Sequence, residues 1–373
     1  LILSGLALAY FIHLFFVFDD LNSFLFFTVL IAFIEFKYHQ DNLAVINESS
    51  SGHGYLNNFK IILLALAALI TIYCAYNFNY KVWQAAKISA LAYMSSDFGQ
   101  TIKYYNQALD LKVVSEENVA INYEEYLASW SDKLDQVKAD KSAGELFAQA
   151  MARVHETFDQ EIKLNPHNAF LYLKLAKINN LEYLFYDDRK YIDRAVATLN
   201  TSLGLSPERL QLFYILGESY VIAGENQKAR EILDKAVRLN PSFSASYYYL
   251  GRAYLADGEP DRAYDYIINQ AIKERKYRPQ NNLILLPLAA ALVDRKSYDK
   301  VIEVYQAILK LEPNNADIMA ALAAVYLQID DYDKAIAAAR LAAAINPALA
   351  EETALFIKLI QSGQIEKLKK SIN

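Results

Sequence analysis

The fold is decided by a stretch of sequence that occurs twice in succession. Residues 210–241 read LQLFYILGESYVIAGENQKAREILDKAVRLNP, and residues 244–271 read SASYYYLGRAYLADGEPDRAYDYIINQA. The pair Leu216-Gly217 recurs one period later as Leu250-Gly251, and a Tyr, a Gly and an Ala follow each pair at the same offsets. Several positions that recur together at one period are typical of a repeat architecture. The chain is therefore predicted to contain stacked copies of one helical unit.

A proline closes each copy of the unit and marks how far the repeats extend. The closing tripeptides are Leu164-Asn165-Pro166, Leu205-Ser206-Pro207, Leu239-Asn240-Pro241, Leu311-Glu312-Pro313 and Ile345-Asn346-Pro347. Proline ends a helix because it lacks the backbone N–H and clashes with the preceding turn. Successive prolines are one, one, two and one periods apart, so the register holds except for extra residues placed near Leu181–Tyr191 and Ile272–Asn282.

This pattern resembles the tetratricopeptide repeat, in which helix A, a turn and helix B together occupy about 34 residues. The resemblance covers about residues 165–347. Small residues let helices A and B approach closely, and larger ones fill the space around the contact. The predicted packing positions are Gly217, Tyr220, Ala229, Gly251, Tyr254, Ala263, Ala323, Tyr326 and Ala335.

In this family helix A lines the inner wall of the solenoid, so the resemblance also implies a binding groove. Its predicted groove residues are Lys177, Gln211, Tyr214, Glu218, Tyr248, Arg252, Leu286 and Ala290. A wall that is polar at one end and apolar at the other suits a protein or peptide partner. The many tyrosines could instead bind carbohydrate, but several of them fall on packing positions such as Tyr220, Tyr254 and Tyr326, which favours a core role.

The predicted fold class is all-α, with transmembrane helices followed by the repeat solenoid. Residues 80–164 are expected to form irregular helical repeats, residues 165–350 the tetratricopeptide solenoid, and residues 351–373 a capping helix at the C-terminus. Low counts of Gly and Pro, 11 and 8 in 373 residues, argue against collagen, a disordered chain and a loop-rich β-sandwich.

Apolar residues are concentrated in the first part of the chain. Residues 1–36 are predicted to form two transmembrane helices, 37–58 a loop, and 59–78 a third transmembrane helix. A run of about 18 apolar residues is close to the length that spans a bilayer core. The alternatives are a secretory signal peptide for the first run and a buried core helix for the third. Because Leu1 lies inside an apolar run, we expect further sequence upstream.

Charged residues beside these segments predict the orientation. Lys37 and Lys60 flank the loop, which places it in the cytoplasm and the repeats on the extracytoplasmic side of a multi-pass cell-membrane protein. Lys81 and Lys87, which follow the third segment, oppose this assignment.

No chemical motif is recognisable in the chain. Cys74 stands alone, the His residues are scattered, and no glycine-rich phosphate loop occurs, so we predict no catalytic, cofactor-binding or metal-binding residues. With 37 Lys and Arg against 43 Asp and Glu, the net charge of −6 disfavours nucleic acid as a partner.

The membrane segment carries a second resemblance. Tyr10–Asp19, read as YFIHLFFVFD, is followed by Asn22–Phe27, and together they look like the end of the membrane domain in the O-antigen ligase/polymerase family. The resemblance implies transfer of a polyprenyl-diphosphate-linked glycan to an acceptor, with the catalytic residues upstream of Leu1. Asp19 would have a supporting role at the membrane edge or would be a hydrated turn residue. The alternative is a membrane-anchored repeat scaffold without catalytic activity.

Overall fold

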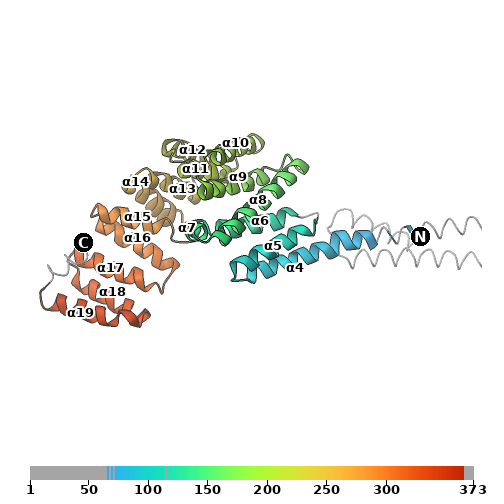
Figure 1. Cartoon of the computed structure of the whole chain (residues 1–373). Coiled ribbons are helices and arrows are strands. Elements are labelled where there is room, and N and C mark those ends of the chain that lie inside the picture. The colour runs from blue at the N-terminus through green and yellow to red at the C-terminus, as the bar shows by residue number, and fades with distance from the viewer. Residues whose placement is uncertain (1–64, 67–68, 70–71, 114–115, 365–373) are drawn as a thin grey trace, which may run out of the picture. The chain divides into compact units, whose positions relative to one another are not determined.

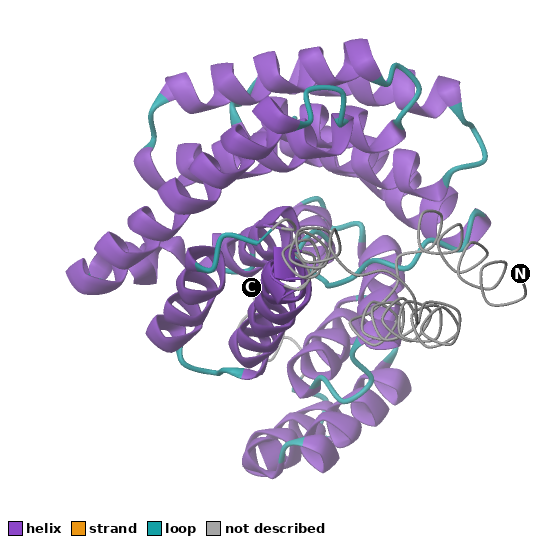
Figure 2. Cartoon of the chain, turned by 90° about the vertical axis from the view of Figure 1, so that its right-hand side faces the viewer, coloured by secondary structure: helices purple, strands orange, loops and turns teal. Residues whose placement is uncertain are grey.

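The computed structural model describes residues 65–66, 69, 72–113 and 116–364 (Figure 1). The two predicted spans within residues 1–36, with Asp19, and the loop 37–58 lie outside this part of the chain, as does the start of the third span. Within the described residues no helix is both long and apolar enough to cross a bilayer. All elements of the described chain are helices (Figure 2), so the prediction of an all-α repeat fold is confirmed.

The chain divides into two compact units, one ending at Pro166 and the other beginning at His167. In the first unit, which we call unit 1, a π-helix runs without a break into the first α-helix. The elements of unit 1 are η1 (Ala75–Tyr80), α4 (Lys81–Met94), α5 (Phe98–Asp110), α6 (Glu116–Ala128), η2 (Ser131–Lys133), α7 (Leu134–Ala139) and α8 (Lys141–Leu164).

Capping side chains and a shared aromatic core define the helices of unit 1. The Asp97 side chain accepts a hydrogen bond from the backbone N–H of Gln100 at 2.6 Å and starts α5. Tyr105 of α5 and Tyr123 of α6 are buried and stack with ring centroids 4.7 Å apart. Phe147 of α8 is fully buried and lies 6.3 Å from the ring of Phe98.

The second unit, unit 2, consists of consecutive helical pairs and a closing helix. The pairs are α9 (Ala169–Tyr186) with α10 (Arg189–Leu205), α11 (Leu210–Ile222) with α12 (Asn226–Leu239), α13 (Ser244–Ala256) with α14 (Pro260–Tyr264) and η3 (Asp265–Glu274), α15 (Leu285–Asp294) with α16 (Tyr298–Leu311), and α17 (Ala316–Gln328) with α18 (Tyr332–Ile345). The chain then continues through η4 (Pro347–Leu349) into α19 (Ala350–Gln361).

Small residues stand where helix A meets helix B. Gly217, Gly251, Ala229, Ala263, Ala323 and Ala335 are buried, whereas Tyr220, Tyr254 and Tyr326 are only half-buried. A Cβ atom at Gly217 would lie 2.5 Å from Cγ of Leu233, which is far inside van der Waals contact. Glycine at this position is therefore required by the close approach of α11 to α12.

The turn between helices A and B has one geometry in four of the pairs, although its sequence varies. Gly224 and Gly258 have φ of 73° and 74°, and the residue after each donates its N–H to a carbonyl in the preceding helix. Lys296 and Asp330 take the same left-handed conformation, with φ of 57° and 62°. A non-glycine residue there costs roughly 1–2 kcal/mol. This cost is small enough for the packing of the helices to offset. The fold therefore persists in the last two pairs although the glycine signature is missing from them.

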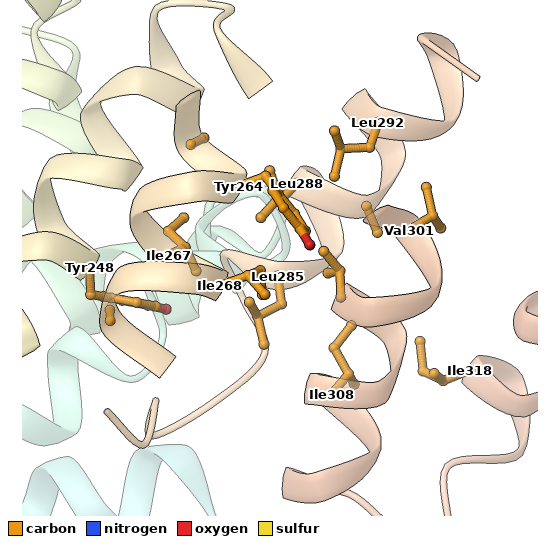
Figure 3. Close-up of a cluster of buried hydrophobic side chains, with 14 of the residues drawn as sticks. Tyr248, Tyr264, Ile267, Ile268, Leu285, Leu288, Leu292, Val301, Ile308 and Ile318 are labelled. Carbon is orange, nitrogen blue, oxygen red and sulfur yellow. The ribbon is translucent and has the colours of Figure 1, made fainter. Parts of the chain in front are cut away.

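The extra residues expected near Leu181–Tyr191 lengthen the first pair, so that α9 has 18 residues and α10 has 17, against 13 and 14 for α11 and α12. The residues expected near Ile272–Asn282 form the end of η3 and the connection from it to α15. Side chains of η3, α15 and α16, including Ile267, Leu288 and Val301, form a buried cluster (Figure 3).

Candidate functional site

The repeat period places matching residues of α11 and α13 side by side. Tyr214 and Glu218 lie one turn apart on α11, and Tyr248 and Arg252 occupy the equivalent positions one repeat later on α13. Residues four apart share a helix face. Since α11 and α13 pack against each other, these four predicted groove residues come together.

An ion pair bridges the two helices at this place. Nη2 of Arg252 donates a hydrogen bond to Oε1 of Glu218 at 2.9 Å, and 24% and 27% of the two side chains remain exposed. The guanidinium also lies 5.3 Å from the ring centroid of Tyr249. Burial alone would lower the pKa of Arg252, but the charge and hydrogen bond of Glu218 outweigh it and raise that pKa. Arg252 thus keeps its charge.

Four tyrosines surround this ion pair. The rings of Tyr214 and Tyr249 are stacked, with centroids 4.6 Å apart and planes 9° from parallel. The ring of Tyr248 lies edge-on to that of Tyr249, with centroids 6.2 Å apart. The centroid of the Tyr248 ring is also 4.6 Å from that of Tyr277. Tyr277 comes from the connection after η3. We call these four residues, with Glu218 and Arg252, the tyrosine cluster.

Burial controls the chemistry of the tyrosine cluster. It raises the pKa of Tyr249 to about 12 and also raises the pKa values of Tyr214, Tyr248 and Tyr277. The Tyr214 hydroxyl pairs with Oγ of the fully buried Ser246 at 2.8 Å. These rings are therefore neutral near pH 7 and act as apolar surfaces with polar edges.

The cluster has an inner and an outer layer. Tyr214 and Tyr248 are buried, whereas Tyr249, Tyr277, Glu218 and Arg252 are half-buried. The outer layer is therefore what a partner would meet. Sequence reasoning missed Tyr249 and Tyr277, although the run Tyr247-Tyr248-Tyr249 signalled an unusual aromatic density on one helix.

The other four predicted groove residues are spread over three helices. Lys177 is half-buried on α9, Gln211 is exposed in the first turn of α11, and Leu286 and Ala290 are exposed on α15. The structure therefore concentrates the predicted site on α11 and α13.

Unit 1 contains a separate cleft that the sequence did not signal. It has a volume of about 870 Å³ and is lined by residues of α4, α5 and α6, with Ala85, Tyr105 and Val119 among its walls. Ser89 also lines it; this residue is buried, at 8% exposed, and its hydroxyl has no hydrogen-bond partner among the described residues. Clefts of this size and apolar character are typical of ligand sites.

No metal centre is present in the described ranges, because no three His, Cys, Asp or Glu side chains there are placed to hold an ion.

These features define a helical-repeat protein with an aromatic surface on adjacent A helices. Tetratricopeptide-repeat family models match residues 183–242, 214–279 and 292–351. The chain therefore contains tetratricopeptide repeats, as the sequence predicted.

Comparison with solved structures finds partial similarity to several proteins, two of which are described as tetratricopeptide proteins. YrrB, described as a tetratricopeptide protein with an unusual peptide-binding site, is 20% identical, with 54% of this chain and 98% of that one covered and a TM-score of 0.37. A thermophilic tetratricopeptide protein from Thermus thermophilus is 19% identical over 55% and 99%, with a TM-score of 0.36. MamA from Desulfovibrio magneticus is 18% identical over 48% and 96%, with a TM-score of 0.35. No curated protein matches the chain.

Proposed function

We propose that unit 2 binds a protein or peptide partner at the tyrosine cluster. The observation that carries this proposal is the outer layer of the cluster, where Tyr249 and Tyr277 lie half-buried beside a half-exposed ion pair. Tyrosine and arginine are enriched among the residues that dominate binding energy at protein interfaces. Both α11 and α13 are fixed by packing on their other faces, so a partner would meet a preorganised surface.

The ion pair also favours a binding role over a purely structural one. A partly buried pair is weak support for stability, because the cost of desolvating two charges offsets much of their attraction. Its remaining donors and acceptors could instead hydrogen-bond a peptide backbone. Because Glu218 neutralises Arg252, the surface favours an aromatic or aliphatic segment with polar backbone groups over a strongly charged one.

The test is selection of a displayed peptide library on the full chain, followed by measurement of Kd for the selected peptides. We expect Tyr249→Ala and Arg252→Ala each to weaken binding at least about tenfold, which corresponds to about 1.4 kcal/mol. Leu341→Ala, at an exposed residue of α18, is the matched control and should leave Kd unchanged. Peptides that bind all three variants as tightly as the parent would refute the site.

The N-terminal sequence supports membrane attachment as part of the same function. Three apolar segments, 1–18, 24–36 and 59–78, precede the repeats, and their flanking lysines favour an extracytoplasmic solenoid. A cysteine introduced at Ser51 and one at an exposed repeat position should then react with impermeant reagents from opposite sides of the membrane, in a chain whose Cys74 is replaced by Ser. Equal labelling from outside would contradict this topology.

Residues 10–27 support a narrower proposal, that the chain is the C-terminal part of an O-antigen ligase/polymerase-like protein. In that case the repeats would recruit or orient the acceptor while upstream residues transfer the polyprenyl-linked glycan. The reading frame upstream of Leu1 tests this. A frame lacking further membrane spans and an outer loop with Arg and His would leave the scaffold function alone.

A further inference from the structure

The continuous helix formed by η1 and α4, at the start of unit 1, carries its largest side chains on the outside. Tyr76, Tyr80 and Trp83 are 51%, 46% and 57% exposed, and their rings follow one another at 5.8 and 6.1 Å. They therefore form a continuous aromatic row along one side of η1 and the start of α4. We call this row the stem stripe.

The stem stripe lies away from the part of the helix that packs in unit 1. Only Ala85, Ser89 and Ala92 of α4 are buried, and all three side chains are small. A helix of a soluble domain places its large apolar residues towards the core and its small or polar ones outside. Here that arrangement is reversed, which indicates a second apolar environment around the stem stripe.

Residue type changes along the helix axis in a definite order. Exposed aliphatic side chains, Leu66, Leu69 and Ile72, come first, the aromatic row follows, and the exposed Lys87 comes after it. Leu91, Tyr93 and Met94 are exposed again at the end of α4, where Tyr93 and Met94 line the cleft of unit 1. A seam between two copies of the chain would repeat the same residue classes along its length. A bilayer boundary instead imposes a gradient from hydrocarbon through an amphipathic layer to water.

Two lysines cover the faces of the aromatic row. Nζ of Lys81 lies 5.5 Å from the ring centroid of Tyr76, and Nζ of Lys87 lies 5.3 Å from that of Trp83. In this arrangement the aliphatic part of each lysine lies along apolar surface, and its ammonium group stays beside the aromatic row. A lysine near an anionic lipid surface is attracted to it electrostatically.

We propose that the stem stripe, with Lys81 and Lys87, is an interfacial belt that lies in the headgroup layer of an anionic phospholipid leaflet. It fixes where the helix formed by η1 and α4 leaves the membrane. Tyr76 and Trp83 are about 10 Å apart along the helix axis, at about 1.5 Å per residue. The headgroup layer on one side of a bilayer is roughly 5–8 Å thick, so the row is long enough to extend through its full depth. This inference rests on the proposed membrane attachment and adds the position of the boundary.

The two tryptophans of the chain provide the test. Trp83 belongs to the stem stripe, whereas Trp130 packs against Phe98 within unit 1, with ring centroids 4.7 Å apart. The full chain is reconstituted in phosphatidylcholine–phosphatidylglycerol vesicles whose acyl chains carry bromine at shallow or deep positions. Trp130→Phe leaves Trp83 as the only indole, and Trp83→Phe leaves Trp130 as the matched control.

We expect the vesicles to carry the protein on flotation, shallow bromines to quench Trp83 more strongly than deep ones, and Trp130 to be unaffected. Flotation without quenching of Trp83, or stronger quenching by deep bromines, would overturn the belt while leaving membrane attachment standing. Absence of flotation would overturn the attachment and the belt with it.

A second copy of the chain is the competing occupant. A Tyr80→Cys variant that also carries Cys74→Ser should stay monomeric on oxidation in dilute vesicles. Disulfide-linked dimers in which the bromines do not quench Trp83 would show that the stem stripe pairs with the stem stripe of a second copy. That result would overturn the belt.

Discussion

Replacement of Gly217 by alanine tests the repeat packing at its tightest point. An ideal Cβ atom at this position lies 2.5, 2.7 and 2.8 Å from Cγ, Cδ1 and Cδ2 of Leu233, a residue that is 1% exposed. Leu233 must then leave its rotamer, or α11 and α12 must move apart. Overpacking of this kind costs about 1–3 kcal/mol. Three contacts under 3 Å place this change in the upper half of that range, and alanine recovers about 1 kcal/mol of helix propensity, so we expect a net loss of about 1–2 kcal/mol.

The loss should appear as a lower melting temperature of the full chain, followed by circular dichroism. For a unit of this size, about 1–2 kcal/mol corresponds to a decrease of roughly 2–8 °C. Hydrogen exchange should place the loss of protection in α11 and α12. Gly204→Ala is the control, because Gly204 lies in α10 with no atom within 4 Å of an added Cβ, and this change should stabilise the protein.

A double-mutant cycle separates the proposed clash from other effects of alanine. Leu233→Ala alone should cost about 2–5 kcal/mol through the cavity that it leaves. In the Gly217→Ala/Leu233→Ala pair the clash is gone and the added methyl group fills part of that cavity. The double variant should therefore be more stable than the sum of the single effects predicts. Strict additivity, or a Gly217→Ala melting temperature equal to that of the parent, would refute the close-contact argument.

Three further predictions concern buried polar groups. Burial raises the folded-state pKa of Tyr249 to about 12. The neutral ring therefore contributes its full stability below the unfolded pKa of about 10, and this contribution is lost as the pH rises from about 10 through 12. Helix content, followed together with tyrosinate absorbance, should decline over this pH range, and Tyr249→Phe should move the decline to higher pH. Tyr214→Phe removes the partner of the buried Ser246 hydroxyl and should cost about 1–3 kcal/mol in denaturant unfolding, with recovery in the Tyr214→Phe/Ser246→Ala variant. Ser89→Ala removes an unpaired buried hydroxyl from the cleft of unit 1 and should raise the melting temperature; an unchanged or lower value would contradict that reading.

The repeat period was sufficient to predict the helical pairs because it reports a contact that every pair must make. Gly217 and Gly251 both meet a large helix B side chain, Leu233 and Ile267 respectively, at 2.5 Å from an added Cβ. Such contacts leave a signal in the sequence wherever they recur. The turn signal was weaker, since Lys296 and Asp330 adopt the left-handed conformation that glycine provides elsewhere.

The cleft of unit 1 could not be predicted in the same way. Its walls come from α4, α5 and α6, and small residues of α4 such as Ala85 and Ala90 leave space that larger residues would fill. Small residues in a helix are ordinarily a sign of close packing, as at Ala229. Only the positions of the neighbouring helices distinguish a filled contact from an open cleft, and the sequence does not contain those positions.

The tyrosine cluster shows where the sequence pattern stops being informative about binding. The period correctly brings Glu218 of α11 opposite Arg252 of α13, because equivalent positions of adjacent repeats are neighbours. Tyr277 has no equivalent in the other repeats, since it belongs to the extra residues after η3, yet it lies 4.6 Å from Tyr248. A periodic wall offers similar surfaces along its length, so it cannot by itself favour one place for a partner. An inserted aromatic residue that breaks the period makes one place different, and we therefore expect substitution of Tyr277 to alter which partner binds more than substitution at a regular groove position such as Gln211.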